Sequence, residues 1–314
     1  MKPYIYIAVF VFWTACDSSE KHTISPPQLK GKIVYSKPIV SLPLRVLVAR
    51  DLDSVSEQYI SDSTDGYGSF NEPNWSPDGN RIVCTFFGFE GPFKLFIYVN
   101  SKKYVTLSSY FDYEPLWSPG GDKILSSVGY FTFQIIDTIS NTVYYNGPDS
   151  SVWNSKVVFL KKGHVRWNTE EEIFLVATPH RPDYPPHAQH DSLREIYRYN
   201  YVTETLVERM TNNLLDESNF EISSDRQRIV FSRGYEADKI TYLMNISDTS
   251  ATPIIQGKHE TVRWFGKTHY LYYVRFPNPT VYVMDTDHPE KEYELMPVYD
   301  ANIDIWAQPD SVGD

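Results

Sequence analysis

One stretch of this sequence decides the fold, and it reads Glu72-Pro73-Asn74-Trp75-Ser76-Pro77-Asp78-Gly79-Asn80-Arg81-Ile82-Val83-Cys84. The pattern predicts a strand, a tight turn and a second strand. Pro77 presets φ for the first turn position, Asp78 can hydrogen-bond nearby backbone, and Gly79 tolerates a positive φ. Trp75 before the turn and Ile82 after it pack over the end of the hairpin and hold its register.

The same pattern recurs along the chain. A second copy reads Glu114-Pro115-Leu116-Trp117-Ser118-Pro119-Gly120-Gly121-Asp122, and four weaker copies follow. The anchor residues of the six copies are Trp75, Trp117, Trp167, Ile222, Trp264 and Trp306. A repeat of about 40 to 50 residues with one hairpin in each unit predicts a β-propeller. The turn residues expected to shape the two best hairpins are Pro77, Asp78, Gly79, Pro119 and Gly120.

Counting strand patterns predicts how the propeller closes. Five units carry four strands each, residues 32–60 carry three, and residues 303–306 carry one. We therefore expect an all-β, six-bladed β-propeller with four antiparallel strands per blade, closed by pairing of the N- and C-terminal strands in one blade. Such pairing protects both sheet edges. Residues 302–306 should pair with residues 32–35, and the closing strand should bury Trp306.

The Trp-Ser-Pro-Asp-Gly hairpin resembles the repeat of TolB-type β-propellers. It is also similar to repeats in the propeller part of some prolyl oligopeptidases and in oligogalacturonate lyases. The resemblance covers about residues 30–314, with residues 72–84 and 114–126 as its most specific part. Resemblance to TolB implies other envelope proteins as partners. Resemblance to the lyases implies a metal held by His and Gln side chains in the channel.

The N-terminus resembles a bacterial lipoprotein signal. Lys2 precedes an apolar run from Tyr4 to Trp13 that is too short to span a bilayer, and Thr14-Ala15 then precedes Cys16. Trp13 departs from the usual pattern, which has an aliphatic residue there. We expect residues 1–15 to be the signal peptide, Cys16 the lipidated residue, 16–30 a flexible tether and 31–314 the propeller. An ordinary cleavable export signal, a retained membrane anchor and a misread core strand are the alternatives.

The amino-acid composition excludes some classes of binding partner and a disulfide-stabilised fold. The chain has 314 residues, 15% of them aromatic, and a net charge of −11. A chain this acidic has no electrostatic drive toward nucleic acid or anionic lipid headgroups. With only Cys16 and Cys84 present, a disulfide framework is impossible. Cys84 is expected to be a small buried hydrophobe.

Few residues suggest metal binding or catalysis. The proline-rich segment 178–193 contains the weak metal candidates His180, His187 and His190, but their spacing matches no tight ligand set, so no metal or other cofactor is favoured. Residues 61–72 partly match a calcium-binding loop, but an ordinary strand-connecting loop is the favoured interpretation. The common catalytic motifs are absent. The chain is therefore expected to be a binding protein rather than an enzyme.

The best binding candidates are polar residues that begin each first strand, because those positions lie toward one mouth of a propeller channel. They are Glu72, Glu114, His164, Arg166, Asn219, Glu221, Arg263 and Asp304. Converging polar groups there predict a site for a peptide or small ligand, the alternative being a wet plug. We expect an exported, lipid-anchored scaffold of the bacterial cell envelope, with a metal-dependent polysaccharide lyase or hydrolase as the rival.

Overall fold

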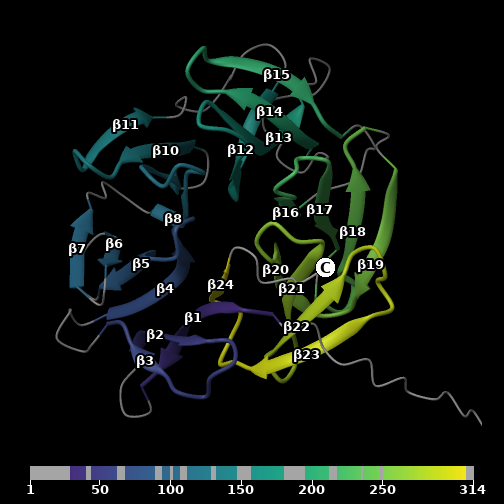
Figure 1. Cartoon of the computed structure of the whole chain (residues 1–314). Coiled ribbons are helices and arrows are strands. Elements are labelled where there is room, and N and C mark those ends of the chain that lie inside the picture. Colours follow the sequence, from purple (N-terminus) through teal and green to yellow (C-terminus); the bar gives the residue numbers. More distant parts are fainter. Residues whose placement is uncertain are drawn as a thin grey trace, which may run out of the picture.

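The computed structural model shows sheets arranged like the blades of a wheel around a central axis (Figure 1). It describes residues 29–39, 44–61, 68–88, 94–99, 102–106, 112–128, 132–146, 157–179, 195–211, 218–234, 236–247 and 250–308. The expected signal peptide and almost all of the tether lie outside these ranges. Within them, no helix is long and apolar enough to cross a bilayer.

Four blades are separate sheets of four antiparallel strands. The first contains β8 (Asp112–Trp117), β9 (Lys123–Val128), β10 (Thr132–Asp137) and β11 (Thr142–Asn146). The second contains β12 (Val157–Trp167), β13 (Glu172–Pro179), β14 (Glu195–Asn200) and β15 (Thr205–Arg209). The third contains β16 (Ser218–Ile222), β17 (Arg228–Arg233), β18 (Ile240–Asn245) and β19 (Ala251–Gln256). The fourth contains β20 (His259–Trp264), β21 (Tyr270–Arg275), β22 (Thr280–Asp285) and β23 (Glu292–Pro297).

The other eight strands form one continuous sheet, which corrects the expectation of six separate blades. Its closing half contains β24 (Ile303–Ala307), β1 (Gly31–Pro38), β2 (Arg45–Asp51) and β3 (Gln58–Tyr59). Its second half contains β4 (Gly68–Trp75), β5 (Arg81–Gly88), β6 (Lys94–Val99) and β7 (Lys102–Thr106). The halves are joined because β2 and β4 meet in one parallel residue pair, Arg45 with Ser69.

The predicted pairing of the two chain ends is present. β24 runs antiparallel to β1, with Lys32 opposite Trp306 and Tyr35 opposite Ile303. The prediction that this strand buries Trp306 was wrong, since the indole is only half-buried. Trp306 ends the strand and rests on the neighbouring hairpin turn, where its Nε1–H donates to the Pro77 carbonyl at 3.1 Å. Ile303 and Ile305 are the apolar residues that β24 buries.

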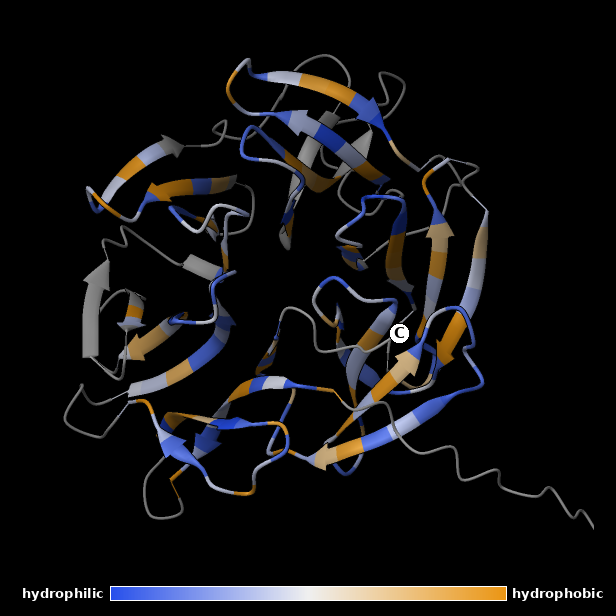
Figure 2. Ribbon diagram, viewed as in Figure 1, coloured by the Kyte–Doolittle hydropathy of each residue, from blue (hydrophilic) through white to orange (hydrophobic). Residues whose placement is uncertain are grey.

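The core lies between neighbouring blades, which explains the sequence pattern of the inner strands. β17 and β21 each bury four consecutive residues, because both faces of their sheets pack against other blades. The outer strand β15, by contrast, is largely exposed. Figure 2 shows apolar segments recurring around the wheel within most of its sheets. Cys84 is fully buried in β5, which confirms its expected role as a small hydrophobe.

The hairpin turns form as predicted, with one correction. Gly79 has a φ of 67°, and the Arg81 N–H donates to Ser76 Oγ at 2.9 Å. In the second hairpin the residue with positive φ is Gly121, at 75°, and not Gly120. Gly121 is four residues after its anchor Trp117, as Gly79 is after Trp75. Two adjacent glycines made the position ambiguous in the sequence.

Replacing Gly79 with Ala should destabilise the protein much more than replacing Gly120. A Cβ on Gly79 would lie 2.3 Å from the Trp306 ring, and a left-handed residue other than glycine costs about 1–2 kcal/mol by itself. At Gly120 the nearest atom is the Glu170 Oε1 carboxylate oxygen, 3.0 Å away on a flexible side chain. Thermal melts of the two variants measure the difference. Equal melting temperatures would show that the turn does not require glycine.

Two of the anchor tryptophans, Trp117 and Trp167, fasten their blades to the blade before. Trp117 Nε1–H donates to the Asn74 carbonyl at 3.1 Å, and Trp167 Nε1–H donates to the Leu116 carbonyl at 3.0 Å. Arg81, at the start of a second strand, also lies 4.4 Å from the ring centre of Trp117 in the next blade. Such contacts between a cation and an aromatic ring contribute about 0.5–1 kcal/mol when exposed and more when desolvated. The repeat therefore encodes contacts between blades as well as the hairpins.

Candidate functional site

The first strands bulge where they approach the axis. Glu72, Glu114 and Asn219 have φ values of 50°, 46° and 47°, and the register of their strands shifts beside them. Thr261 takes the equivalent position in β20, with a φ of 52°. Bulges re-aim side chains and often occur near functional sites. The recurring left-handed residue is thus a feature of the repeat, and it helps direct the neighbouring polar groups into the channel.

Two arginines link the acidic residues of neighbouring blades. Arg166 pairs with Glu114 at 3.1 Å and with Glu221 at 2.6 Å. Arg263 lies 3.8 Å from the same Glu221 carboxylate and pairs with Asp304 at 3.0 Å. Glutamate or aspartate therefore alternates with arginine across five first strands. These contacts bring five of the polar candidate residues side by side in the structure.

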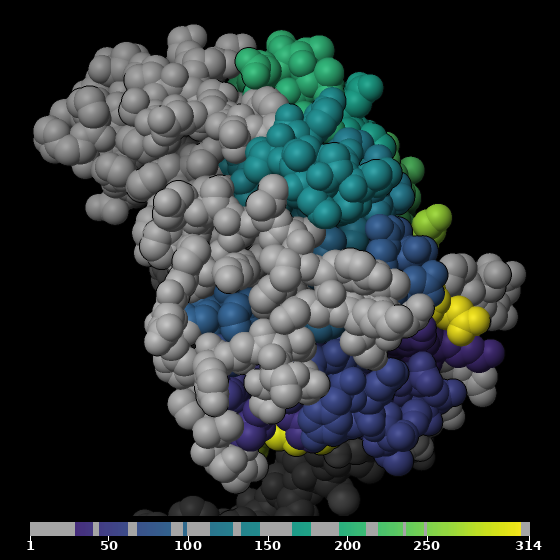
Figure 3. All heavy atoms as spheres, turned by 90° about the vertical axis from the view of Figure 1, so that its left-hand side faces the viewer, coloured from purple at the N-terminus to yellow at the C-terminus, as the bar shows by residue number. Residues whose placement is uncertain are grey.

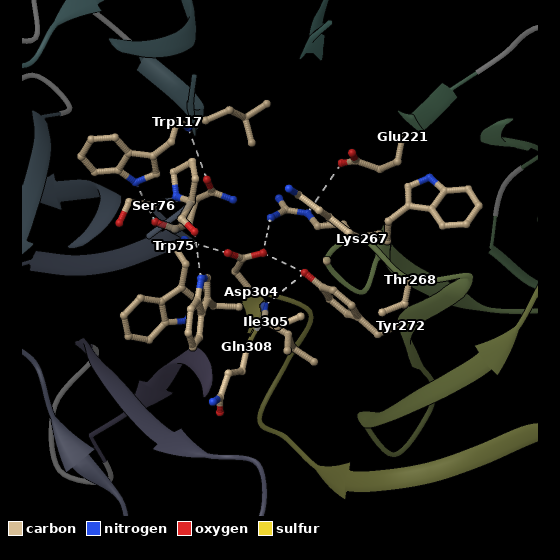
Figure 4. A pocket seen from close by; sticks show the side chains of 18 of the residues that line it. Trp75, Ser76, Trp117, Glu221, Lys267, Thr268, Tyr272, Asp304, Ile305 and Gln308 are labelled. Carbon is tan, nitrogen blue, oxygen red and sulfur yellow. Dashed lines mark hydrogen bonds and ion pairs between the residues drawn. The ribbon is translucent and has the colours of Figure 1, made fainter. Parts of the chain in front are cut away.

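Asp304 and Glu72 complete the circuit. Asp304 Oδ2 accepts the Trp75 N–H at 2.7 Å, and its Oδ1 accepts the Tyr272 hydroxyl at 2.7 Å (Figure 4). Glu72 Oε2 accepts the Glu114 N–H at 2.8 Å. A circle of contacts results that passes through β4, β8, β12, β16, β20 and β24 and closes within β4 through the backbone between Glu72 and Trp75. We call this set the polar ring, and its members are Glu72, Glu114, Arg166, Glu221, Arg263 and Asp304.

The ring is held in a desolvated setting. The side chains of Arg166 and Asp304 are only 11% and 9% exposed. Burial alone would lower the pKa of Arg166, but the carboxylates of Glu221 and Glu114 outweigh it and raise that pKa. Burial, reinforced by the Asp304 charge, raises the pKa of Tyr272 well above its usual value. Arg166 therefore remains charged, and Tyr272 remains a hydrogen-bond donor, across the physiological pH range.

Cavities lie on either side of the ring. The larger, here the upper cavity, has a volume of about 720 Å³ and opens on the side of the hairpin turns. Four anchor indoles line it, namely Trp75, Trp117, Trp264 and Trp306. The lower cavity has a volume of about 460 Å³ and is more polar, with Lys239, Glu260 and Asn302 in its wall. Arg263 lines both cavities, so the ring forms a partition between them.

Two indoles in the wall of the upper cavity have buried N–H groups without an acceptor in the described part of the chain. Trp264 is 9% exposed, and the Nε1–H groups of Trp264 and Trp75 have no acceptor among the described residues. Lys267 adds an exposed ammonium at the rim. Buried N–H groups without partners are costly, and apolar walls with a few donors are typical of ligand sites. The cavity therefore suits a ligand with apolar groups for the indole walls and an oxygen acceptor for Lys267 at the rim.

Several site residues differ from the sequence expectation. Asn219 is exposed and belongs to the wall of the lower cavity, so it is not a member of the ring. His164 falls in β12, and its side chain lies outside the described part of the structure. Sequence reasoning missed Tyr272 because it belongs to a second strand, where an aromatic residue normally indicates core. It also missed Lys239, whose buried Nζ donates to the His259 carbonyl at 2.9 Å.

The expected metal candidates cannot be placed. His180, His187 and His190 lie outside the described residues, as do residues 62–67 of segment 61–72. Among the residues described, His269, Asp285 and Asp287 form a group that could hold a metal ion. They lie where β21 begins and β22 ends, apart from the ring. Arg228 already neutralises Asp287 through a 2.8 Å ion pair.

Solved structures with the same fold include several propellers. TolB from Acinetobacter baumannii aligns with a TM-score of 0.64 at 16% identity, covering 88% of this chain and 66% of its own. This chain thus spans slightly less than two thirds of that protein. A putative TolB from Agrobacterium tumefaciens aligns with a TM-score of 0.57 at 12% identity, covering 90% and 99%.

A third similar structure is an oligogalacturonate lyase in complex with manganese. Its TM-score is 0.52 at 14% identity, covering 86% of this chain and 75% of the lyase. No protein-family model matches the sequence, and no curated protein matches it. At these identities the likeness establishes the β-propeller fold and leaves function to be argued from the site.

Proposed function

We propose that this chain is a lipid-anchored, six-bladed propeller of the bacterial cell envelope that binds a protein segment or small ligand in its upper cavity. The observation that carries the proposal is the cavity itself, an indole-walled space of about 720 Å³ above a closed polar ring. The ring partitions the channel and gives the cavity a floor. The likeness to TolB structures supports an envelope setting, since the chain shares their fold.

The strand connections support counting the eight-stranded sheet as two blades. Seven register pairs join β1 to β2, and six join β5 to β6, whereas one pair joins β2 to β4. A single backbone bridge between long ladders is a contact between neighbours. The polar ring agrees with this count, because its members come from six first strands.

The chemistry of the ring favours binding over catalysis. A general acid donates a proton to the substrate and a general base accepts one from it. Either group has to lie within reach of the substrate and needs a pKa near the working pH. In the ring, Glu114, Glu221 and Asp304 are each held in an ion pair with an arginine. The arginines are committed to these carboxylates as well. We infer that the ring supports the cavity floor and takes no proton from a ligand.

Reversing the charge at the cavity rim should abolish partner capture. We expect Lys267→Glu to reduce the material recovered by the purified protein from detergent-solubilised envelopes at least about tenfold, the ratio that corresponds to 1.4 kcal/mol. Lys258→Glu is the matched control, because it makes the same charge change beside Phe276, away from the upper cavity. Both variants should melt like the parent. Equal recovery with both variants would place the binding site elsewhere.

Mature protein from native membranes should begin at a lipidated Cys16. The apolar run ending in Thr14-Ala15-Cys16 is the reason for this expectation. Intact-mass spectrometry should show the mass of residues 16–314 plus acyl chains, and Cys16→Ser should release the protein from the membrane fraction. An intact Met1 or an unmodified Cys16 in that fraction would contradict lipid anchoring.

The rival function is metal-dependent cleavage of a polysaccharide. It is favoured by the likeness to the lyase, which was solved with manganese, and by the histidines of segment 178–193. Elemental analysis of the purified protein separates the two proposals. Stoichiometric manganese or zinc that is lost in the combined His180→Ala, His187→Ala and His190→Ala variant would favour the lyase. Asp285→Asn tests the group around His269 in the same way.

A further inference from the structure

The first and last described residues of the chain lie together at the rim of the upper cavity. Gly31 pairs with Ala307, and the Gln308 N–H donates to the Lys30 carbonyl at 3.0 Å. Gln308 also lines the upper cavity, and Figure 4 shows it beside Ile305 and Asp304. Any anchor on the preceding residues therefore attaches on this side. We call the side with this rim and the hairpin turns the upper face.

The turns between the third and fourth strands of the sheet units also lie on the upper face. In blade β20–β23, for example, β22 runs from Thr280 at the lower turn to Asp285 at the upper one. The corresponding turns of three other sheet units carry apolar tips. Val55 is 91% exposed between β2 and β3, Ile139 is 83% exposed between β10 and β11, and Val202 is 54% exposed between β14 and β15.

These three residues are the aliphatic side chains that are more than half exposed among the residues described. They belong to three units that lie at the lower left, the upper left and the top of the wheel in Figure 1, so the apolar tips are concentrated on that side of the upper face. By contrast, the exposed Tyr59 and Tyr299 rings flank the ammonium of Lys37, at 5.7 and 5.5 Å, and so already have a partner. Figure 3 shows the wheel from its edge, with the blue and teal strands of two neighbouring sheet units facing the viewer.

We propose that the upper face rests on the membrane surface, with Val55, Ile139 and Val202 contacting the bilayer. This inference rests on the proposed lipid at Cys16. Residues 17–28 separate that cysteine from Leu29, and even fully extended they span at most about 45 Å. A tether of this length keeps the wheel near the lipid, and the exposed aliphatic tips decide which face turns toward it. Isolated apolar side chains at turn tips can enter the headgroup boundary without exposing backbone to the hydrocarbon.

The negative charge of the protein determines which lipid headgroups the upper face can contact. The chain carries a net charge of −11, and the upper-face turns include Asp53, Glu204 and Asp287. An anionic surface would repel them, so the contact suits zwitterionic headgroups such as phosphatidylcholine or phosphatidylethanolamine. The upper cavity then opens toward the bilayer. Its ligand has to belong to the same membrane or reach the cavity from the edge of the wheel.

Hydrogen exchange on vesicle-bound protein tests the orientation. The chain from residue 16 onward is coupled through the Cys16 thiol to a maleimide lipid in phosphatidylcholine vesicles, and buried Cys84 does not compete for the reagent. We expect exchange in the turns at 52–57, 138–141 and 201–204 to slow at least threefold relative to uncoupled protein. The turn at 276–279, on the lower face, is the internal control and should not change. Protection of 276–279 instead, or of neither face, would overturn the proposal.

A variant distinguishes contact from mere proximity. In Val55→Ser/Ile139→Ser/Val202→Ser we expect the three turns to lose their protection while the protein stays coupled and melts like the parent. Unchanged protection in this variant would overturn the assigned contacts. Replacing a third of the lipid with phosphatidylglycerol should weaken protection, and strengthening would contradict the charge argument. Because the maleimide supplies the anchor, these results stand apart from native acylation and from ligand capture.

Discussion

A chain shortened to end at residue 300 is expected to unfold or aggregate at temperatures where the full chain is stable. The deletion removes β24, which pairs with β1 along five residues. It removes the buried side chains of Ile303 and Ile305, and loss of one such side chain costs about 2–5 kcal/mol. It also leaves the β1 edge open to pairing with other chains. The total loss is comparable to the whole stability of a typical domain.

Thermal melts and light scattering measure this effect. The matched control ends the chain at residue 308, which keeps β24 and the Gln308 contact with Lys30. We expect the control to melt like the full chain and to remain monomeric. If the chain ending at residue 300 melts within a degree or two of the control and does not scatter light, strand closure contributes little.

Replacing Asp304 with Ala should destabilise the protein by about 3–5 kcal/mol, the usual effect of removing one partner from a buried ion pair. The carboxylate neutralises Arg263 at 3.0 Å and accepts hydrogen bonds from Tyr272 Oη and the Trp75 N–H. Without it, the arginine remains buried with only the more distant Glu221, and two donors lose their acceptor. Denaturant unfolding monitored by tryptophan fluorescence gives the change in the free energy of unfolding.

Two further variants test whether the loss in Asp304→Ala comes from breaking a buried ion pair. Asp287→Ala removes a carboxylate that also pairs with an arginine, but that side chain is 59% exposed, so the loss should stay below about 1 kcal/mol. Combining Asp304→Leu with Arg263→Met removes both charges and should recover part of the stability lost in Asp304→Ala. Equal losses for Asp304→Ala and Asp287→Ala would show that the ring is not a buried network.

The repeat was readable because its signals are local. Pro77, Asp78 and Gly79 act on their own backbone within a few residues, so the hairpin follows from the sequence. The recurrence of tryptophan at the same place in successive units then indicates a propeller. Antiparallel pairing of the chain ends could also be inferred, because residues 32–35 lack a first strand and residues 302–306 lack a second.

The polar ring was only partly readable. Its six members could be named from their place in the repeat. The prediction that they begin each first strand was wrong, since Arg166 and Arg263 lie near the ends of β12 and β20. Their partners could not be named, because Arg166 contacts Glu114 and Glu221, which are 52 and 55 residues away. Tyr272 was overlooked because a buried tyrosine in a second strand looks like core. Its hydroxyl contact to Asp304 depends on how two strands lie across the axis.

The sequence by itself determined that this protein is a propeller built from repeated hairpins, that its ends pair, and that polar residues gather at the channel. These features depend on turn chemistry, strand alternation and repeat spacing, which are properties of short stretches. Only the tertiary structure decided which glycine of the second hairpin adopts a positive φ and that Trp306 stays half-exposed. It also decided that the two halves of the eight-stranded sheet join through Arg45 and Ser69, and that the ring closes. These depend on distances and angles between blades, which arise when all the sheets pack around one axis.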